Sequence, residues 1–281
     1  MSGLPESSSR SSLPSDLNFE LMNFDRRKRD ARDIVSSFDL HTLPSEFDPD
    51  SYQRITVEQS TRPSFEWTVA GDLWATFMRW IVHDPICWDF ANRCQPTETR
   101  AQLFAEKLRR RFQQEFDRYD ELPHHTAPGL EVQPSSPAHA SFIVAQVAEI
   151  ANKIHSLVAA ALTDLQDRAV GRGGTVKVLL GALEAICRRC ENISPVSPER
   201  DQSPSGTEVR ISLYDVLVGQ PPPATPNMIL QALERASEMS PGILSKMKTE
   251  FETIGRVLPA NTPLTYLQQF QNLSAQAGAT M

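Results

Sequence analysis

The stretch FAEKLRRRFQQEFDRY, Phe104 to Tyr119, decides the fold class because its apolar residues recur at helical rather than strand spacing. They follow one another at intervals of four, four, four and three residues, which places them on one face of an α-helix. These positions are Phe104, Leu108, Phe112, Phe116 and Tyr119. Lys107, Arg109, Arg110 and Arg111 fall on the other faces, so the stretch predicts an amphipathic helix with a basic exposed side.

Two further apolar stripes follow this stretch. Between Ala138 and about Val170 the stripe predicts one long buried helix or two shorter ones, with Pro137 suited to the first turn and Gly171 after the end. The next stripe runs from Val176 to Cys190, and Thr175 is its candidate N-cap. Both patterns have helical periodicity.

Similar patterns extend over the rest of the chain. Further helices are expected at Ser15 to Phe38, Phe65 to Val82, Asn227 to Met239, Ile243 to Leu258 and Pro263 to Leu273. No segment alternates as a hairpin does, although EVRISLYDVLV, Glu208 to Val218, is compatible with a short strand. We therefore expect an all-α fold.

Composition restricts the compartment and the partners. The formal net charge of −7 excludes general attraction of the whole surface to a phosphate backbone, so nucleic-acid binding would need a local basic patch. Four cysteines without a secretory signal are typical of free thiols in a reducing compartment. We expect a cytoplasmic protein, with the nucleus as the alternative, and no membrane-spanning segment.

The distribution of serine, proline and charge predicts the domain organisation. Residues 1–15 are Ser-rich and polar and are expected to form a disordered tail, and residues 276–281 a second tail. A single helical-repeat domain is expected over residues 16–275. Proline-rich stretches predict long loops near residues 122–137, 194–206 and 219–226.

Two groups of residues have partial resemblance to known chemical sites, but their spacing disfavours both. CRRC, Cys187 to Cys190, continues the apolar stripe, which favours packed thiols, and His83, Cys87 and Cys94 lack the paired spacing of zinc ligands. DRYDE, residues 117–121, has no second acidic box to help hold magnesium, which favours a solvated helix end. Nucleophile and phosphate-loop motifs are absent, and GRGG at residues 171–174 lacks the spacing of a dinucleotide turn. We expect no catalytic residues, metal or cofactor; an all-α enzyme is a distant alternative.

Two basic runs are candidate binding sites. RRKR, Arg26 to Arg29, is flanked by aspartates, which favours a salt-bridged exposed helix face. Arg109, Arg110 and Arg111 are the stronger candidates for contact with RNA or a partner, because the buried stripe of their helix forces them outward. The alternative is a plain solvated face.

Several segments together resemble consecutive helices of one known family of helical domains. FAEKLRRRFQQEF (104–116) resembles a family helix that ends in Cys-Gln-x-Glu-Phe, with Phe112 in place of the cysteine. DPICWDFANRC (84–94) is similar to an acidic-Pro segment followed by an aromatic residue, Ala-Asn and a cysteine, one residue short of the usual spacing. SFIVAQVAEIANKIHSLV (141–158) resembles the helix that opens with Phe-Ile and later carries Ile and His.

The remaining matches follow in the order of the family over about residues 30–275. LLGALEAICRRCENI (179–193) resembles a helix rich in leucine and cysteine, and MKTEFETIGRVL (247–258) with PLTYLQQFQNL (263–273) resembles the last helix pair. TEVRISLYDVLVGQPPPATPNMILQALERASEM (207–239) is an additional segment, and the terminal basic motif is missing.

These segments together resemble the middle domain of translation initiation factor 4 gamma, and this resemblance implies a fold and a function. The implied fold is a crescent of antiparallel helix pairs in the manner of HEAT repeats, with Trp88 and Phe90 in the core. The implied function is that of a non-enzymatic scaffold in mRNA metabolism, in translation initiation or its regulation. The implied partners are a DEAD-box RNA helicase of the initiation factor 4A type and, as a second candidate, mRNA.

A different functional class is also consistent with the sequence. Ser194, Ser197 and Ser203 each precede proline, so each is a candidate phosphorylation site, and a phosphate there adds about two negative charges. The alternative hypothesis is therefore a general helical adaptor for protein–protein interactions that is regulated by phosphorylation and unrelated to RNA.

Overall fold

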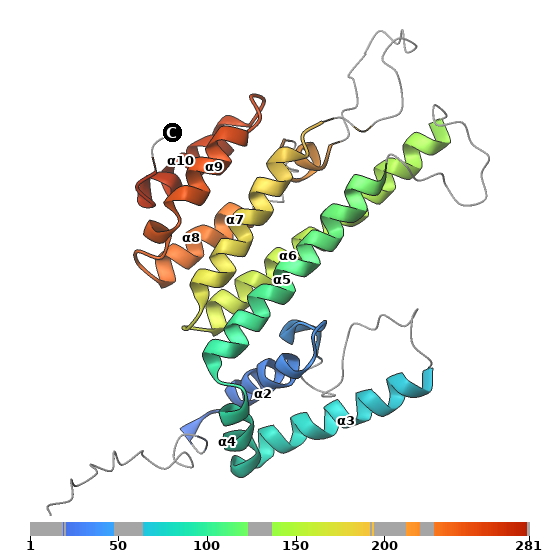
Figure 1. Ribbon diagram of the computed structural model, residues 1–281, viewed down its shortest axis with the longest axis vertical. Helices are drawn as coiled ribbons and strands as arrows, with labels where there is room; N and C mark the ends of the chain where they lie inside the picture. Colours follow the sequence, from blue (N-terminus) through green and yellow to red (C-terminus); the bar gives the residue numbers. More distant parts are fainter. Residues whose placement is uncertain are drawn as a thin grey trace, which may run out of the picture. The chain divides into compact units, whose positions relative to one another are not determined.

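The computed structural model describes residues 19, 21–47, 64–122, 137–191, 193, 212–219 and 228–279. Over these residues the protein consists of helices, turns and connections, without a β-strand (Figure 1). The all-α class predicted from the sequence is confirmed. The predicted tail at residues 1–15 lies outside the described residues, as do the predicted loop at 194–206 and most of those at 122–137 and 219–226.

Contacts divide the chain into two compact units, Met1–Leu103 and Phe104–Met281, where the sequence predicts one domain. We call them unit 1 and unit 2 and describe each by itself. The HEAT-like crescent concerns the arrangement of the whole chain and stays a prediction.

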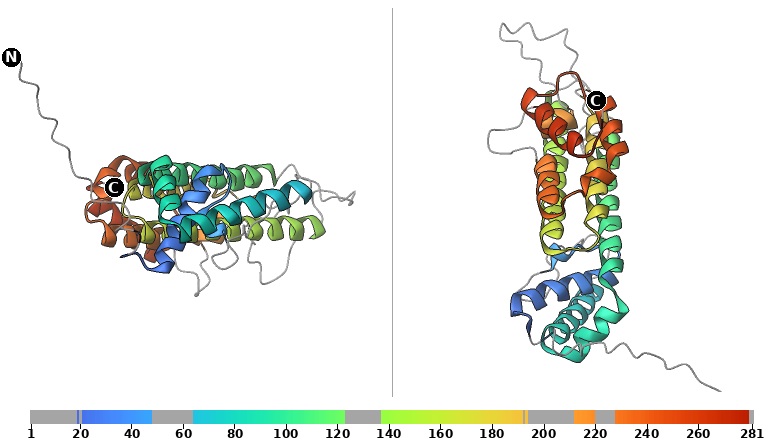
Figure 2. Two further views of the ribbon diagram at one scale, coloured as in Figure 1. Left: turned by 90° about the horizontal axis from the view of Figure 1, so that it is seen from below. Right: turned by 90° about the vertical axis from the view of Figure 1, so that its left-hand side faces the viewer.

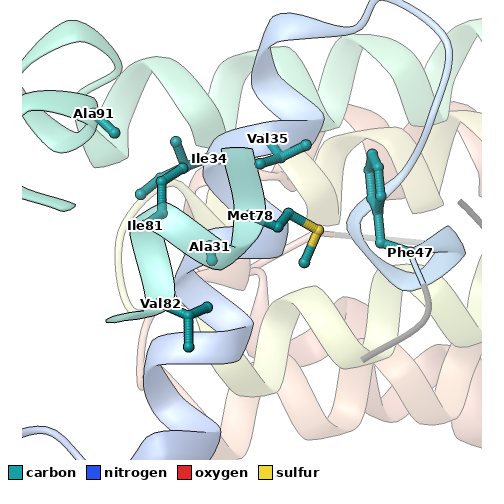
Figure 3. Packing of buried hydrophobic residues seen from close by; sticks show 8 residues of the cluster. All are labelled: Ala31, Ile34, Val35, Phe47, Met78, Ile81, Val82 and Ala91. Atoms are coloured by element: carbon teal, nitrogen blue, oxygen red, sulfur yellow. The ribbon is translucent and has the colours of Figure 1, made fainter. Parts of the chain in front are cut away.

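Unit 1 is built around a small apolar core. Its elements are α2 (Phe24–Phe38), a short 3₁₀ turn (Pro44–Glu46), α3 (Ser64–His83), α4 (Pro85–Cys94) and the first residues of α5 (Thr97–Glu121). The eight core residues come from α2, α3, α4 and the chain after the 3₁₀ turn, and they lie close together in Figure 3. They are Ala31, Ile34, Val35, Phe47, Met78, Ile81, Val82 and Ala91. Burial of these side chains stabilises unit 1.

A buried arginine ties three helices of unit 1 together. Arg100 lies near the start of α5, and its Nε donates to Asp33 Oδ2 on α2 at 2.7 Å. One of its Nη atoms donates at 2.8 Å to Asn92 Oδ1 on α4 and to the carbonyl oxygen of Gln95. A charged side chain is tolerated in this position because its hydrogen-bonding groups are matched by acceptors.

Unit 2 consists of helices that run in alternating directions along the chain. Its elements are most of α5, α6 (Pro137–Asp167), α7 (Arg172–Arg188), a π-helical turn (Asp215–Gly219), α8 (Met228–Met239), a 3₁₀ turn (Leu244–Lys246), α9 (Lys248–Val257) and α10 (Leu264–Gln276). Figures 1 and 2 show α5, α6 and α7 lying alongside one another, each reversing the direction of the one before. The apolar stripe predicted between Ala138 and about Val170 corresponds to one helix, α6, which ends at Asp167.

The aromatic stripe of α5 is buried as the sequence predicts. Phe104, Leu108, Phe112, Phe116 and Tyr119 all have relative exposures of 4 % or less. The rings of Phe112 and Phe116 stack with their centroids 6.2 Å apart. The helix is therefore held by its stripe, and the side chains on its opposite side are presented from a fixed backbone.

The turn between α6 and α7 differs from the sequence prediction. Gly171, with φ of 80°, is the N-cap of α7, because glycine adopts the left-handed conformation at little cost. Thr175, predicted as the cap, is buried in the first turns of α7, and its hydroxyl donates to Asp164 Oδ2 at 2.9 Å. The prediction that Thr175 caps the helix was wrong, because its hydroxyl bonds to Asp164 of the neighbouring helix α6.

Two further predictions are corrected. Ser212 to Val218, within the stretch compatible with a strand, forms a helical turn whose Leu213 and Tyr214 side chains are fully buried. Tertiary packing outweighs the β-propensity of its valines and tyrosine. The helix expected from Ile243 begins instead at Lys248, after the separate 3₁₀ turn.

Candidate partner-binding surface

The candidate surface is formed by Arg109, Arg110 and Arg111 on α5, in unit 2, and we call it the arginine surface. The side chains of Arg109 and Arg110 are 67 % and 58 % exposed, whereas Arg111 is partly buried. The outward direction predicted for Arg109 and Arg110 is thus confirmed. The prediction was wrong for Lys107, which is buried because it lies three residues from Phe104, beside the apolar stripe. Arg111 presents less of its side chain to a partner.

Glu106 modifies the charge of the arginine surface. Arg109 donates to it through Nε at 3.0 Å and through an Nη atom at 2.8 and 2.9 Å, which is a bidentate pair. Arg110 donates from Nε to the same carboxylate at 2.9 Å. The hydrogen bonds from Arg109, and then those from Arg110, hold the pKa of Glu106 below its ordinary value. One carboxylate thus offsets part of the positive charge and orients two guanidinium groups.

Charged residues in the next turns of α5 form hydrogen bonds and ion pairs within unit 2. Arg118 donates to Glu149 Oε1 at 3.0 Å and to Gln146 Oε1 at 2.8 Å, both on α6. Lys153 lies between Glu149 and Glu115, with its Nζ 3.6 and 3.7 Å from their oxygens. These residues join α5 to α6, so the arginine surface is the part of α5 best placed for an external partner.

In the RRKR run of unit 1, Arg27 and Lys28 pack against aromatic rings of their own unit, whereas Arg26 and Arg29 are exposed. The guanidinium group of Arg27 lies 4.7 Å from the ring centroid of Phe19, and one Nη donates to the Val82 carbonyl oxygen at 3.4 Å. The Nζ of Lys28 lies 4.8 Å from the ring centroid of Phe24. Cation–π contacts with aromatic rings therefore stabilise Arg27 and Lys28 within unit 1, which makes them weaker candidates for binding phosphate.

The cysteines do not assemble a metal site among the described residues, where no group of three or more His, Cys, Asp or Glu residues could hold an ion. Cys187 is buried, and burial raises the pKa of its thiol to about 12. Cys190 is exposed, so its predicted place on the buried stripe was wrong. The helix ends at Arg188, and the stripe ends with it.

The acidic residues of the DRYDE stretch lie at an exposed helix end. Asp117, Asp120 and Glu121 are exposed, as predicted. Asp120 accepts two hydrogen bonds from Arg189, at 2.9 and 2.5 Å, and so joins the ends of α5 and α7. The guanidinium group of Arg189 also lies 4.7 Å from the ring centroid of Phe116.

A small pocket lies inside unit 2 beside His155. It is lined by Ile154, His155, Val158, Ile186, Leu217, Val218, Met228, Ile229 and Tyr266. Burial lowers the pKa of His155, which favours the neutral ring near neutral pH. Seven of the nine lining residues are apolar, and His155 and Tyr266 are the two that carry polar side-chain groups.

Sequence reasoning missed or misplaced several residues. Phe90 is 66 % exposed on α4 rather than in the core, whereas Trp88 packs against the core of unit 1. The part played by Glu106 was missed, although its position three and four residues before two arginines is a recognisable ion-pair pattern. The contacts of Asp120 and Arg189 join distant parts of the sequence, so no local signal indicates them. Ser194, Ser197 and Ser203 lie outside the described residues.

Comparison with known proteins does not assign a family: no family model, curated protein or solved structure matches the chain. Over the described residues, no helix combines the length and apolar character needed to cross a membrane.

Proposed function

We propose that the protein is a non-enzymatic helical scaffold of mRNA metabolism, active in translation initiation or its regulation in the cytoplasm. It docks a DEAD-box RNA helicase of the initiation factor 4A type. The resemblance of segments in order over residues 30–275 to the middle domain of translation initiation factor 4 gamma supports this proposal.

The arginine surface is the observation that carries the proposal. Two guanidinium groups are more than half exposed, are oriented by Glu106 and stand on a helix whose opposite face is buried. A preorganised cationic surface binds acidic groups of a partner with a smaller loss of side-chain entropy than mobile side chains incur. Because the chain is acidic overall, such a surface also favours one docking orientation.

Charge reversal tests the proposal. The full chain carrying Arg109→Glu, Arg110→Glu and Arg111→Glu keeps good helix formers and an intact aromatic stripe, so its helical content should match that of the wild type. Helicase recovered with the chain at low salt should fall roughly tenfold, which corresponds to the loss of about 1.4 kcal/mol of binding free energy. Added salt should weaken the wild-type complex more than the residual complex of the variant.

A matched control separates a local effect from a change in net charge. Arg188, Arg235 and Lys248 are also exposed in unit 2 and pair with glutamates of their own helices. Replacing these three by glutamate changes the charge equally and should leave helicase recovery unchanged. If the arginine-surface variant folds and retains full association, the surface is not the docking site. If RNA crosslinking falls while helicase recovery is intact, the surface contacts RNA instead.

A further inference from the structure

Ser212 to Gly219 is a short segment that packs against the rest of unit 2. The chain on both sides of it, at residues 194–211 and 220–227, lies outside the described residues. Leu213 and Tyr214 are fully buried, and Val218 is 3 % exposed. The segment therefore contributes apolar anchors to unit 2 as a bound helical peptide would.

The surface beneath the segment recognises both its backbone and its side chains. The Tyr119 hydroxyl on α5 accepts a hydrogen bond from the Leu213 amide at 3.1 Å, and the Arg189 carbonyl oxygen accepts one from the Tyr214 amide at 3.2 Å. The Tyr214 hydroxyl donates to Thr262 Oγ1, between α9 and α10, at 2.7 Å. Three separate parts of unit 2 thus position one short segment. We call Tyr119, Arg189 and Thr262 the docking surface.

Contacts outside the segment hold the docking surface in place. Arg189 is fixed by its two hydrogen bonds to Asp120 and by the ring of Phe116. Tyr119 belongs to the buried stripe of α5. A binding surface whose residues are held by other contacts is preorganised, so it persists when its ligand leaves.

The segment also supplies its own helical turn. The Ser212 hydroxyl donates to Asp215 Oδ2 at 2.8 Å, and the Asp215 amide donates to Ser212 Oγ at 2.9 Å. The bond from the Asp215 amide to the Ser212 hydroxyl is that of an N-capping serine, which helps a short peptide to fold where it binds. The recognised pattern is therefore Ser-Leu-Tyr-Asp followed, after two residues, by valine.

The energetics favour reversible docking. Burial of three apolar side chains contributes a favourable free energy to docking. The conformational entropy lost when the segment is ordered contributes an unfavourable free energy of the same order. Segments with such a balance open locally before the surrounding helices unfold.

We propose that the docking surface is a peptide-binding site and that Ser212 to Gly219 is its intramolecular ligand. A partner protein that carries a short helical segment with the same pattern displaces it. Because Leu217 and Val218 also line the pocket beside His155, displacement opens that pocket. This site is separate from the arginine surface and does not depend on the identity of the helicase.

A peptide-binding measurement tests the proposal in the full chain. Leu213→Asp with Tyr214→Ala removes the anchors of the internal segment and leaves Tyr119, Arg189 and Thr262 unchanged. A fluorescent peptide of residues 209–219 should bind this variant at least ten times more tightly than it binds the wild-type chain, where the internal segment competes. A control peptide with Tyr214→Ala should bind neither chain. Equal binding of the unaltered peptide to both chains, or equal binding of the two peptides, would overturn the proposal.

Hydrogen exchange of the unaltered chain gives a second test that does not depend on how the variant folds. The amides of Leu213 and Tyr214 should exchange at least ten times faster than those of Leu180 and Leu183 in the buried part of α7. Protection of all four amides to the same level, lost together in denaturant, would show that the segment is a permanent part of the core and would overturn the proposal.

Discussion

Cys187 and Cys190 differ in burial because the helix that sets their spacing ends between them. Cys187 is on the buried side of α7, but α7 ends at Arg188, and Arg189 leaves helical geometry with a ψ of 46°. A sequence pattern four residues long cannot show where a helix stops. The prediction of two packed thiols is therefore confirmed for Cys187 and wrong for Cys190.

This difference gives a test by single substitutions. Cys187→Ser places a hydroxyl in an apolar environment and should lower the free energy of unfolding by ~1–3 kcal/mol. Cys190→Ser changes an exposed side chain and should alter it by less than ~0.5 kcal/mol. Urea unfolding followed by circular dichroism measures both. Equal losses would contradict the burial difference, and stoichiometric zinc lost with either variant would contradict the packing interpretation.

Phe90 and Trp88 were predicted together in the core, yet residues two apart in a helix point in different directions. Ala91, three residues after Trp88, is the buried residue of α4, and Phe90 lies off that face. The spacing alone could have excluded one of the two aromatic residues. What it could not show is which of them packs inward.

The exposure of Phe90 predicts a small effect of its removal. Phe90→Ala should change the free energy of unfolding by less than ~0.5 kcal/mol. Phe47→Ala, which leaves a cavity in the same unit, should cost ~3–5 kcal/mol. Thermal or urea unfolding of the two variants compares them directly. A loss at Phe90 as large as that at Phe47 would place Phe90 in a packed interface.

At the scale of elements, apolar periodicity was sufficient to predict where most helices lie. The stripe of α5 and the long helix α6 follow directly from their spacing. Features that depend on another helix were not predictable, because local patterns do not record tertiary partners. The Thr175 hydroxyl bonds to Asp164, and the Leu213 amide bonds to Tyr119, so neither follows the local preference of its segment.

Arg172 shows how one side chain can secure the ends of two helices. Its Nε donates to the carbonyl oxygens of Leu165 and Arg168 at 2.8 and 2.7 Å, at the end of α6. One of its Nη atoms donates to the carbonyl oxygen of Met239 and the hydroxyl of Ser240, at the end of α8, at 2.9 and 2.8 Å. A guanidinium group meets acceptors in two directions, and it also interacts favourably with both helix dipoles.

Replacement of Arg172 by lysine should therefore be far from neutral. A single ammonium group cannot reach both helix ends, so Arg172→Lys should lower the free energy of unfolding by ~1.5–3 kcal/mol. Arg188→Lys is the control, because Arg188 is an exposed side chain paired with Glu184 of its own helix, and should change it by less than ~0.5 kcal/mol. Similar values for the two variants would show that the bonds to α6 and α8 contribute little.

At the scale of the molecule, the sequence predicted the all-α class, which the structure confirms. It also predicted one domain, whereas contacts divide the chain into two units. Repeating helical stripes are expected in one helical domain or in two, because each stripe reports only that a helix is buried against some neighbour. The arginine surface could be located from the sequence for the same reason, since a well-defined buried stripe fixes which side chains point outward. Its partial neutralisation by Glu106 required the side-chain geometry.

The proposed function requires the scaffold to bind one state of the helicase better than the other. A scaffold with equal affinity for the open and closed helicase would shift no equilibrium, however tightly it bound. On this proposal, an acidic surface of the helicase meets the arginine surface better in one of the two states.

The most direct measurement is therefore the equilibrium affinity of the full chain for a DEAD-box helicase of the initiation factor 4A type. It is measured once with the helicase alone and once with a non-hydrolysable ATP analogue and single-stranded RNA, which close it. We predict about tenfold tighter binding to the closed helicase, a coupling free energy of about 1.4 kcal/mol, and loss of this difference when Arg109, Arg110 and Arg111 are reversed to glutamate. Absence of binding, or equal affinity for the open and closed helicase, would contradict the proposed function.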